Sequence, residues 1–162
     1  AEKLFGKKID FQFSERAVDI NNRMPLAVIT RLEKILGDTL SRKRVLLLGV
    51  SYRQDVGDTR NTPSEILVKE LKRRDIEVVC HDPLVEYWQE MGIKVIHDLP
   101  EFEAFDIIIL AVPHKEYKEI DFKKLSFKRN SVILDANNVL TNKQIEQIRS
   151  IGSELLFIGR GN

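Results

Sequence analysis

The sequence predicts an α/β domain built on a doubly wound parallel sheet of about six strands. The first observation is a series of short apolar runs from residue 44 onwards. They are hydrophobic almost without interruption, as expected of strands that are buried on both faces. The second observation is that polar stretches of helical character separate these runs. Such alternation is typical of parallel sheets with crossover helices, so the expected fold is Rossmann-like.

The apolar runs define the expected strands, which are Arg44–Gly49, Ile76–Cys80, Lys94–Ile96, Asp106–Val112, Ser131–Asp135 and Glu154–Ile158. The clearest helical stretches are Pro63–Arg74 and Thr141–Ser150. Weaker helical stretches are expected around residues 85–91, 100–104 and 115–125. Pro63 is suited to the first turn of its helix, because proline has no N–H to leave unpaired there.

The first 40 residues differ in pattern from the rest and predict a helix that precedes the sheet. Apolar residues recur there at helical spacing, at Ile20, Met24, Val28, Leu32 and Ile35/Leu36. Gly37 stands where a C-terminal cap belongs, and Pro25 predicts a kink or a junction of two helices. Two interpretations are open: the helix packs on its own domain, or it is a connector that pairs with a second copy. We place the boundary between a connector segment, 1–40, and an α/β domain, 41–162.

The composition is that of a soluble globular domain. The chain has 162 residues, of which 43% are hydrophobic and 31% are charged, with a formal net charge of +1. This charge gives no reason to expect nucleic acid or a membrane surface as a partner. No apolar run approaches the length of about 20 residues that a membrane span needs. A single cysteine excludes an internal disulfide and is consistent with the reducing cytoplasm, where we expect the protein to reside.

The candidate ligand site is the loop after the first strand, residues 49–64, because open parallel sheets bind ligands beyond the carboxyl ends of their strands. Its glycine spacing does not match the dinucleotide fingerprint G-x-G-x-x-G. Arg53 and Arg60 flank the approach to the next helix, and guanidinium groups and helix N-termini both favour phosphate. A phosphate or pyrophosphate site is one interpretation. The other is that these arginines pair with Asp55 and Asp58 as part of the loop structure.

Other residues near the strand ends have less specific interpretations. Tyr52 could stack on a base or ribose, or simply pack. The segment Asp135–Asn138, at the end of the fifth predicted strand, could supply polar contacts or form a turn. Cys80 and His81 are neighbours on a strand and therefore point to opposite faces, so we expect no catalytic pair. His97 and His114 show no metal-ligand spacing, and no metal site is expected.

Several motifs resemble the C-terminal domain of the UDP-glucose/GDP-mannose dehydrogenase family. LGVSYRQDVGDTRNTPS, followed by VVCHDPLV, resembles the family's LGLAYK-x-x-x-x-DTR-x-SP and HDP. DIIILAVPH and SVILDANNVL follow in the family's order, the second where the family carries D-G-R-N, and LFIGRGN resembles its closing run. DINNRMPLAVITRLEKIL resembles the end of the central segment, which carries N-x-x-(M/Q)-P and pairs subunits. The resemblance spans residues 15–162.

The resemblance implies a UDP-sugar-binding domain from an NAD-dependent UDP-sugar 6-dehydrogenase. Such enzymes oxidise the C6 alcohol of a nucleotide sugar to a carboxylate in two NAD-dependent steps. Tyr52 and Arg53 match the aromatic–lysine pair that contacts the nucleotide sugar, with arginine in place of lysine. Asn137 stands where D-G-R-N has its arginine and is a further candidate for substrate binding. Arg60 matches the arginine of DTR, which reaches towards the NAD held by the N-terminal domain.

The resemblance also implies what this chain lacks. The family's nucleophilic cysteine lies in G-G-x-C-x-P-K-D, upstream of the central helix, and neither that motif nor a glycine-rich NAD loop is present. Cys80 does not match that nucleophile. We therefore expect a piece of a longer enzyme of polysaccharide biosynthesis that has no catalytic residue and is inactive alone. Its expected partners are a UDP-sugar, its own N-terminal NAD-binding half and a second copy, through the helix around residues 15–36.

Two alternative functions remain open from the sequence. The first is a stand-alone module that binds a UDP-sugar. The second is a structural dimerisation domain, which the loss of the family arginine at Asn137 favours.

Overall fold

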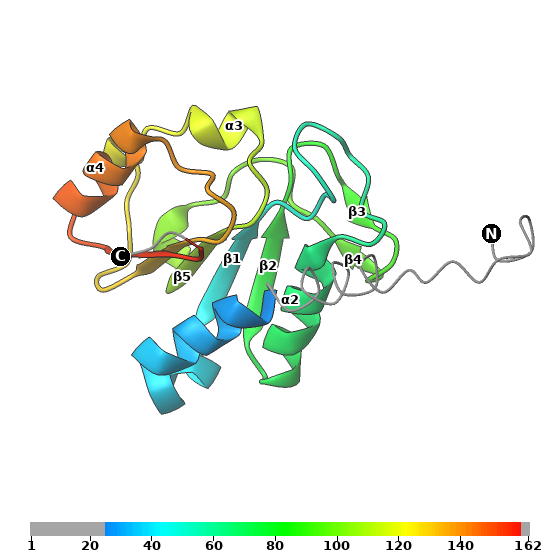
Figure 1. The fold of residues 1–162 in the computed structure, drawn as a ribbon, viewed down its shortest axis with the longest axis horizontal. Helices are drawn as coiled ribbons and strands as arrows, with labels where there is room; N and C mark the ends of the chain where they lie inside the picture. Colours follow the sequence, from blue (N-terminus) through cyan, green and yellow to red (C-terminus); the bar gives the residue numbers. More distant parts are fainter. Residues whose placement is uncertain (1–24, 160–162) are drawn as a thin grey trace, which may run out of the picture.

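The computed structural model describes residues 25–159, which form a doubly wound α/β domain (Figure 1). A five-stranded sheet with strand order β2-β1-β5-β6-β7 lies at its centre. Every pairing in this sheet is parallel. The predicted fold class is confirmed, with one strand fewer than expected. The strands are β1 (Arg44–Leu48), β2 (Glu77–His81), β5 (Ile107–Leu110), β6 (Val132–Asp135) and β7 (Glu154–Phe157).

Helices cover both faces of the sheet, as Figure 1 shows. Val45 and Leu47 of β1 point to one face, where residues 25–36 and helix α2 pack. Leu46 and Leu48 point to the other face, where α4 packs. All four side chains are fully buried, which explains the unbroken apolar run in the sequence. The helices are α2 (Pro63–Arg73), α3 (Lys115–Lys118) and α4 (Asn142–Ser150), with 3-10 turns at Gly37–Arg42, Phe102–Ala104 and Phe122–Lys124.

The two long helices begin where their capping residues predict. Thr62 precedes α2, and its side chain accepts a hydrogen bond from the backbone N–H of Ser64. Thr141 precedes α4 and forms a capping box with Gln144, in which each side chain bonds the other residue's backbone N–H. The helix that includes residues 25–36 ends at Gly37, which has a positive φ of 49° and so confirms the predicted C-terminal cap.

The region between β2 and β5 differs from the prediction. A small antiparallel hairpin forms there, from β3 (Tyr87–Trp88) and β4 (Ile93–Lys94). The helix expected around residues 85–91 is therefore wrong, as is the parallel strand expected at Lys94–Ile96. Val85 and Trp88 are both buried and stand three residues apart, which is helical spacing, but Trp88 belongs to β3 and pairs with Ile93. Only a single parallel bridge, between Ile96 and His81, extends the main sheet on this side.

The described part of the first helix packs on its own domain. Val28, Ile29 and Leu32 are at most 2% exposed and belong to the same apolar cluster as the strands of the sheet. This supports the first of the two interpretations for residues 25–36. Ile20 and Met24, and any kink on the N-terminal side of Pro25, lie outside the described residues. Among residues 25–159, no helix has both the length and the apolar character needed to cross a bilayer.

Leu32→Ala is expected to lower the free energy of unfolding by about 3 kcal/mol, because it removes a fully buried leucine side chain. Urea denaturation followed by circular dichroism would measure the change. Leu26→Ala is the matched control on the same helix: that side chain is 39% exposed and its loss should cost less than about 1 kcal/mol. Equal costs at the two positions would show that the helix does not belong to this core.

Candidate functional site

A pocket opens at the carboxyl ends of β1, β5 and β6. In the strand order the chain reverses direction between β1 and β5, and such a switch point is where open α/β sheets bind ligands. The pocket has a volume of about 120 Å³. Loops after three strands, the start of α2 and the first helix all contribute to its walls. The lining residues are Pro25, Val28, Ser51, Tyr52, Thr62, Pro63, Ser64, Leu67, Ala111, Val112, Ala136 and Asn137.

Gly49 begins the loop after β1 in a conformation that other residues rarely adopt, with a φ of 102°. A Cβ atom at this position would lie 2.5 Å from Cβ of Val112. The glycine therefore allows the loops after β1 and β5 to approach closely. The carbonyl of Gly49 accepts a hydrogen bond from the Ser64 hydroxyl, and that of Ser51 accepts one from the Thr62 hydroxyl. Both contacts tie the loop to the start of α2.

Asp82, at the end of β2, is the main anchor of this loop. Its Oδ2 atom accepts hydrogen bonds from the backbone N–H groups of Val50 and Ser51, at 2.9 and 3.0 Å, and from the Ser51 hydroxyl at 2.8 Å. Oδ1 accepts from the backbone N–H of Leu84. Burial alone would raise the pKa of Asp82, but these bonds and one from His114 outweigh it and lower the pKa to about 2. The carboxylate is therefore a permanent internal anion beneath the pocket wall.

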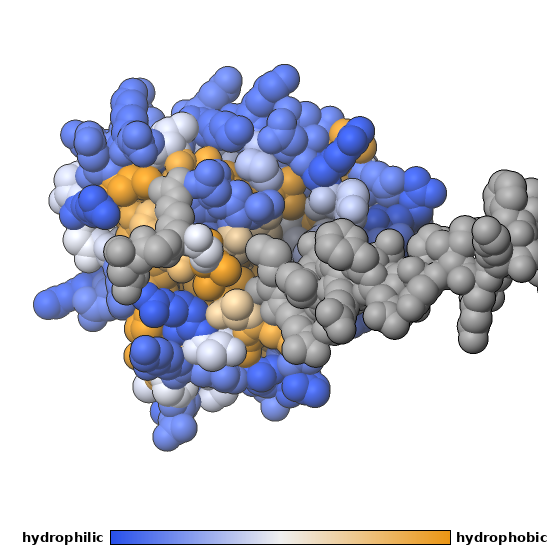
Figure 2. All heavy atoms as spheres, in the orientation of Figure 1, coloured by the Kyte–Doolittle hydropathy of each residue, from blue (hydrophilic) through white to orange (hydrophobic). Residues whose placement is uncertain are grey.

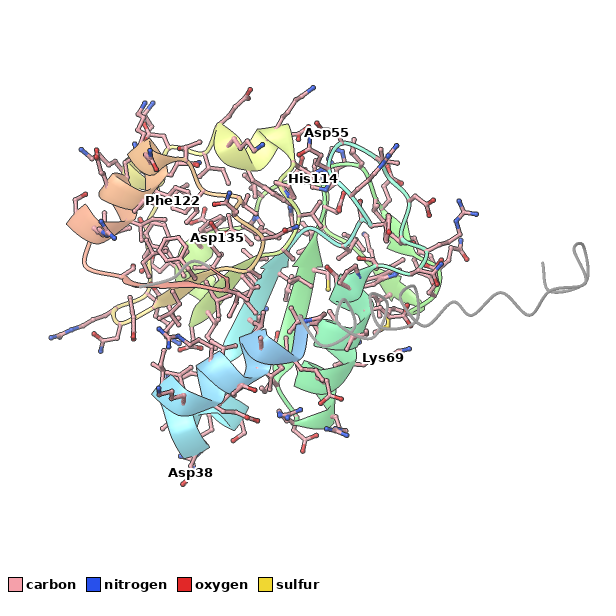
Figure 3. The ribbon with its side chains drawn as sticks, in the orientation of Figure 1. Asp38, Asp55, Lys69, His114, Phe122 and Asp135 are labelled. Atoms are coloured by element: carbon pink, nitrogen blue, oxygen red, sulfur yellow. The ribbon has the colours of Figure 1, made fainter. Side chains whose placement is uncertain are left out.

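His114, in the loop after β5, connects Asp82 to the far end of the same loop. Its Nδ1 accepts a hydrogen bond from the backbone N–H of Asp55 at 2.9 Å. Since Nδ1 accepts, Nε2 carries the proton and donates to Oδ2 of Asp82 at 3.2 Å. The imidazole is fully buried. Figure 3 shows Asp55 and His114 side by side above the ends of the strands.

Asp135 organises the opposite wall of the pocket. It ends β6 and is 1% exposed. Its Oδ1 accepts from the backbone N–H groups of Asn137 and Val139, and its Oδ2 accepts from that of Leu140. Both interpretations of the segment Asp135–Asn138 therefore apply, each to a different residue. Asp135 stabilises the turn, whereas Asn137 lines the pocket and donates from Nδ2 to the Ala111 carbonyl.

Two of the three predicted substrate residues line the pocket, and the third does not. Tyr52 and Asn137 both line the pocket, and Tyr52 is 55% exposed and thus open to a ligand. Arg53 lies next to Tyr52 on the exposed loop but is not part of the pocket wall. Within residues 25–159 its guanidinium forms no ion pair, so the suggested pairing with Asp55 does not occur there. Asp55 instead accepts a hydrogen bond from the backbone N–H of Lys115.

Arg60 follows the second interpretation of the loop, because it pairs with Asp58. Its Nε and Nη2 donate to the two carboxylate oxygens of Asp58 at 2.9 and 2.7 Å. The hydrogen bond from Arg60 lowers the pKa of Asp58 to about 2, and the same contact raises the pKa of Arg60. The Arg60 side chain is nevertheless 77% exposed.

The backbone amides expected to hold an anion at the start of α2 already have partners. Pro63 has no N–H, Ser64 donates to the Thr62 side chain, and Glu65 donates to the Thr62 carbonyl. An anion at this site would therefore depend on side-chain cations, for which Arg53 is the candidate.

Cys80, His81 and the group Asp55, His114 and Glu116 are further titratable side chains near the strand ends. Burial raises the pKa of Cys80 to about 12, so its thiol is not a nucleophile. His81 points to the other face, as predicted, where it bonds Tyr117, and burial lowers its pKa. Asp55, His114 and Glu116 bring potential metal ligands within 4.8 Å of one another, but both ring nitrogens of His114 already have hydrogen-bond partners.

Sequence reasoning missed Asp82 and His114 as determinants of the loop. The sequence does contain part of the signal that could have identified Asp82. An aspartate that directly follows a buried strand at the ligand-bearing edge needs hydrogen-bond donors, and the adjacent loop amides are the obvious source.

Comparison with known proteins identifies related domains. Residues 46–142 match the model described as "UDP-glucose/GDP-mannose dehydrogenase family, UDP binding domain". A curated relative, the UDP-N-acetyl-D-mannosamine dehydrogenase of Methanocaldococcus jannaschii, is 34% identical over 136 residues. The match covers 81% of this chain and 30% of the relative.

Two solved structures share the fold and are similar in sequence. The NDP-N-acetyl-D-galactosaminuronic acid dehydrogenase of Methanosarcina mazei superposes with a TM-score of 0.75 and 29% identity, over 88% of this chain and 30% of that one. The UDP-D-ManNAc dehydrogenase of Pyrococcus horikoshii superposes with a TM-score of 0.74 and 26% identity, over 96% of this chain and 35% of that one. The chain thus spans about a third of the length of the proteins it matches.

Proposed function

This chain belongs to the UDP-glucose/GDP-mannose dehydrogenase family, and from that premise we propose that it holds the UDP part of a nucleotide sugar for an NAD-dependent UDP-sugar 6-dehydrogenase. The observation that carries the proposal is the pocket at the switch point of the sheet. Two of the residues that the family motifs select, Tyr52 and Asn137, line this pocket although they lie far apart in the sequence.

In this proposal each substrate residue has a distinct role. Tyr52 is exposed at the pocket and stacks on the base or ribose. Arg53, on the adjacent exposed position, pairs with the diphosphate through its planar fork. Asn137 donates one N–H of Nδ2 to the Ala111 carbonyl, so its side-chain carbonyl and its second N–H are the groups offered to the ligand.

NAD belongs to the missing N-terminal half of the parent enzyme in this proposal. The described residues do not fit a dinucleotide at their own switch point, because the loop after β1 lacks the glycine fingerprint. Moreover, the backbone amides of Val50 and Ser51 are occupied by Asp82. In this proposal Arg60 is the residue of this chain that contacts the cofactor, which is supported by the 77% exposure of its side chain even while it pairs with Asp58.

The parent enzyme oxidises the C6 alcohol of UDP-glucose or a UDP-N-acetylhexosamine to the uronic acid, and this chain alone is inactive. Its partners are its own N-terminal half and a second copy, through the helix around residues 15–36. We place the enzyme in the cytoplasm, in polysaccharide biosynthesis. A stand-alone UDP-sugar-binding module would bind UDP equally well but would be encoded without an N-terminal half. A structural dimerisation domain would form dimers and bind no UDP.

Calorimetric titration of the 162-residue chain with UDP tests the proposal. Arg53→Ala is expected to weaken binding about tenfold, because a hydrogen bond to a charged group contributes about 1.5 kcal/mol. Arg73→Ala is the matched control: it removes the same charge from an exposed position at the far end of α2 and should leave the affinity unchanged. Absence of UDP binding by the unmodified chain, together with a stable dimer in sedimentation, would support the structural alternative instead.

A further inference from the structure

We propose that His114 is a positioning residue for nucleotide binding, because it fixes both ends of the loop segment that carries Tyr52 and Arg53. The inference rests on the proposed function, in which these two residues contact the nucleotide. His114 itself lies outside the pocket wall, and so does Asp82. Its two ring nitrogens bond the loop after β1 and the anchor of that loop, so the loop is the route by which its side chain acts on binding.

The two ring nitrogens of His114 serve the two ends of this segment. At the far end, Nδ1 accepts directly from the backbone N–H of Asp55. At the near end, Nε2 donates to Oδ2 of Asp82, and the same oxygen holds the backbone N–H groups of Val50 and Ser51. Between these anchors lie only residues 52–54, all of them exposed. The nucleotide-contacting part of the loop is thus a short segment that His114 supports directly at its far end and through Asp82 at its near end. Within the segment, the backbone N–H of Tyr52 also donates to the Asp58 carbonyl at 2.7 Å.

The far anchor lies at a residue whose backbone conformation is uncommon for residues other than glycine. Asp55 has a φ of 57°, in the left-handed region that costs a non-glycine residue energy. The contact between the two loops is reciprocal: Asp55 donates to His114 from its backbone, and its carboxylate accepts from the backbone N–H of Lys115 at 3.1 Å. The loops after β1 and β5 therefore hold each other in place.

The geometry at His114 calls for a side chain that both accepts and donates. Neutral imidazole does so, and a glutamine amide offers the same pair of functions through its carbonyl and its NH₂ group. Phenylalanine keeps the ring that packs edge-on against Tyr117 at 5.5 Å between centroids, but it offers neither hydrogen bond. His114→Phe and His114→Gln therefore separate the hydrogen bonds from the packing.

The test is calorimetric titration with UDP of the full chain and of both variants, together with hydrogen exchange of the backbone amides at 52–55. His114→Phe is expected to weaken UDP binding at least tenfold and to speed exchange at these amides. His114→Gln is expected to stay within about threefold of the parent affinity. Asp106→Asn is the control. It removes a carboxylate that accepts a backbone N–H at the opposite end of the sheet, so it lowers stability without changing the position of the nucleotide-binding loop.

Several outcomes would overturn the inference. Unchanged UDP affinity in folded His114→Phe would do so, as would an equal loss in the phenylalanine and glutamine variants. If His114→Phe does not fold, hydrogen exchange in the unmodified chain decides instead, because the backbone N–H of Asp55 donates directly to Nδ1 of His114. This amide should exchange at least tenfold more slowly than those of the neighbouring exposed residues 53 and 54, and equal rates would reject the inference.

The failure of the proposed function would be distinguishable from the failure of this inference. If the unmodified chain binds no UDP, the proposed function is lost, and hydrogen exchange alone decides on positioning. Faster exchange at 52–55 in His114→Phe but not in His114→Gln would uphold the role of His114 in fixing the loop, whereas unchanged exchange in both would reject it.

Discussion

Asp82→Ala is expected to lower the free energy of unfolding by about 4 kcal/mol, since several buried donors lose their acceptor at once. The donors are the backbone N–H groups of Val50, Ser51 and Leu84, the Ser51 hydroxyl and Nε2 of His114. Asp82 is itself fully buried, so water does not readily replace the carboxylate. Urea denaturation at pH 7 would measure the change.

The pH dependence of this loss identifies its cause. The pKa of Asp82 is lowered from an ordinary value of 3.8 to about 2 in the folded protein. The lowered pKa adds about 2.5 kcal/mol to the free energy of unfolding. This contribution of Asp82 is fully present above pH 4 and is lost as the pH falls through about 2. The near-isosteric variant Asp82→Asn cannot ionise. The stability difference between it and the parent should shrink between pH 4 and pH 2, and a difference that stays constant would contradict the assignment.

Gly49→Ala is expected to cost about 4 kcal/mol or to prevent folding, because the added methyl group has no space. It would lie 2.5 Å from Cβ of Val112 and 2.8 Å from the backbone nitrogen of the same residue. The φ of 102° adds backbone strain for any residue with a side chain. The backbone at Gly49 cannot move away easily, because its N–H donates to the His81 carbonyl at 2.8 Å. Thermal unfolding of the variant would measure the cost.

Gly152→Ala separates the two causes. Gly152 also has a positive φ, of 77°, but a Cβ atom there would meet nothing within 4 Å. It should therefore cost only the backbone strain of about 1 kcal/mol. Similar losses at the two glycines would mean that crowding against Val112 is not what requires a glycine at position 49.

The sequence predicted most of the fold because its determinants are local. Strands buried on both faces appear as unbroken apolar runs, and α2 and α4 begin where Pro63 and Thr141 stand. The family resemblance is confirmed by the match over residues 46–142. The hairpin of β3 and β4 was not predictable in this way, because Val85 and Trp88 have helical spacing while tertiary burial of Trp88 selects an extended pairing.

The site could be located from the sequence but not built from it. The position of the loop after the first strand follows from the topology alone, and Tyr52 and Asn137 do line the pocket there. The anchors could not be found because their partners are remote: Asp82 is 32 residues from both Val50 and His114. For Arg60, the sequence offered two interpretations of equal merit, and only the distance to Asp58 distinguishes them.

The surface seen in Figure 2 is largely polar, with apolar side chains gathered between α4 and residues 25–36. The open edges of the sheet have a different character. Both outer strands are short, with 5 residues in β2 and 4 in β7, and each begins with an exposed glutamate. The end of β2 nearest the pocket is already covered, because Ile96 exchanges backbone hydrogen bonds with Cys80 and Asp82.

Short and charged edges resist the addition of a strand from another molecule. Two copies of this domain therefore have little opportunity to join their sheets into one continuous sheet. Strand-by-strand growth, which begins aggregation in many proteins with long open edges, is therefore disfavoured at these two strands.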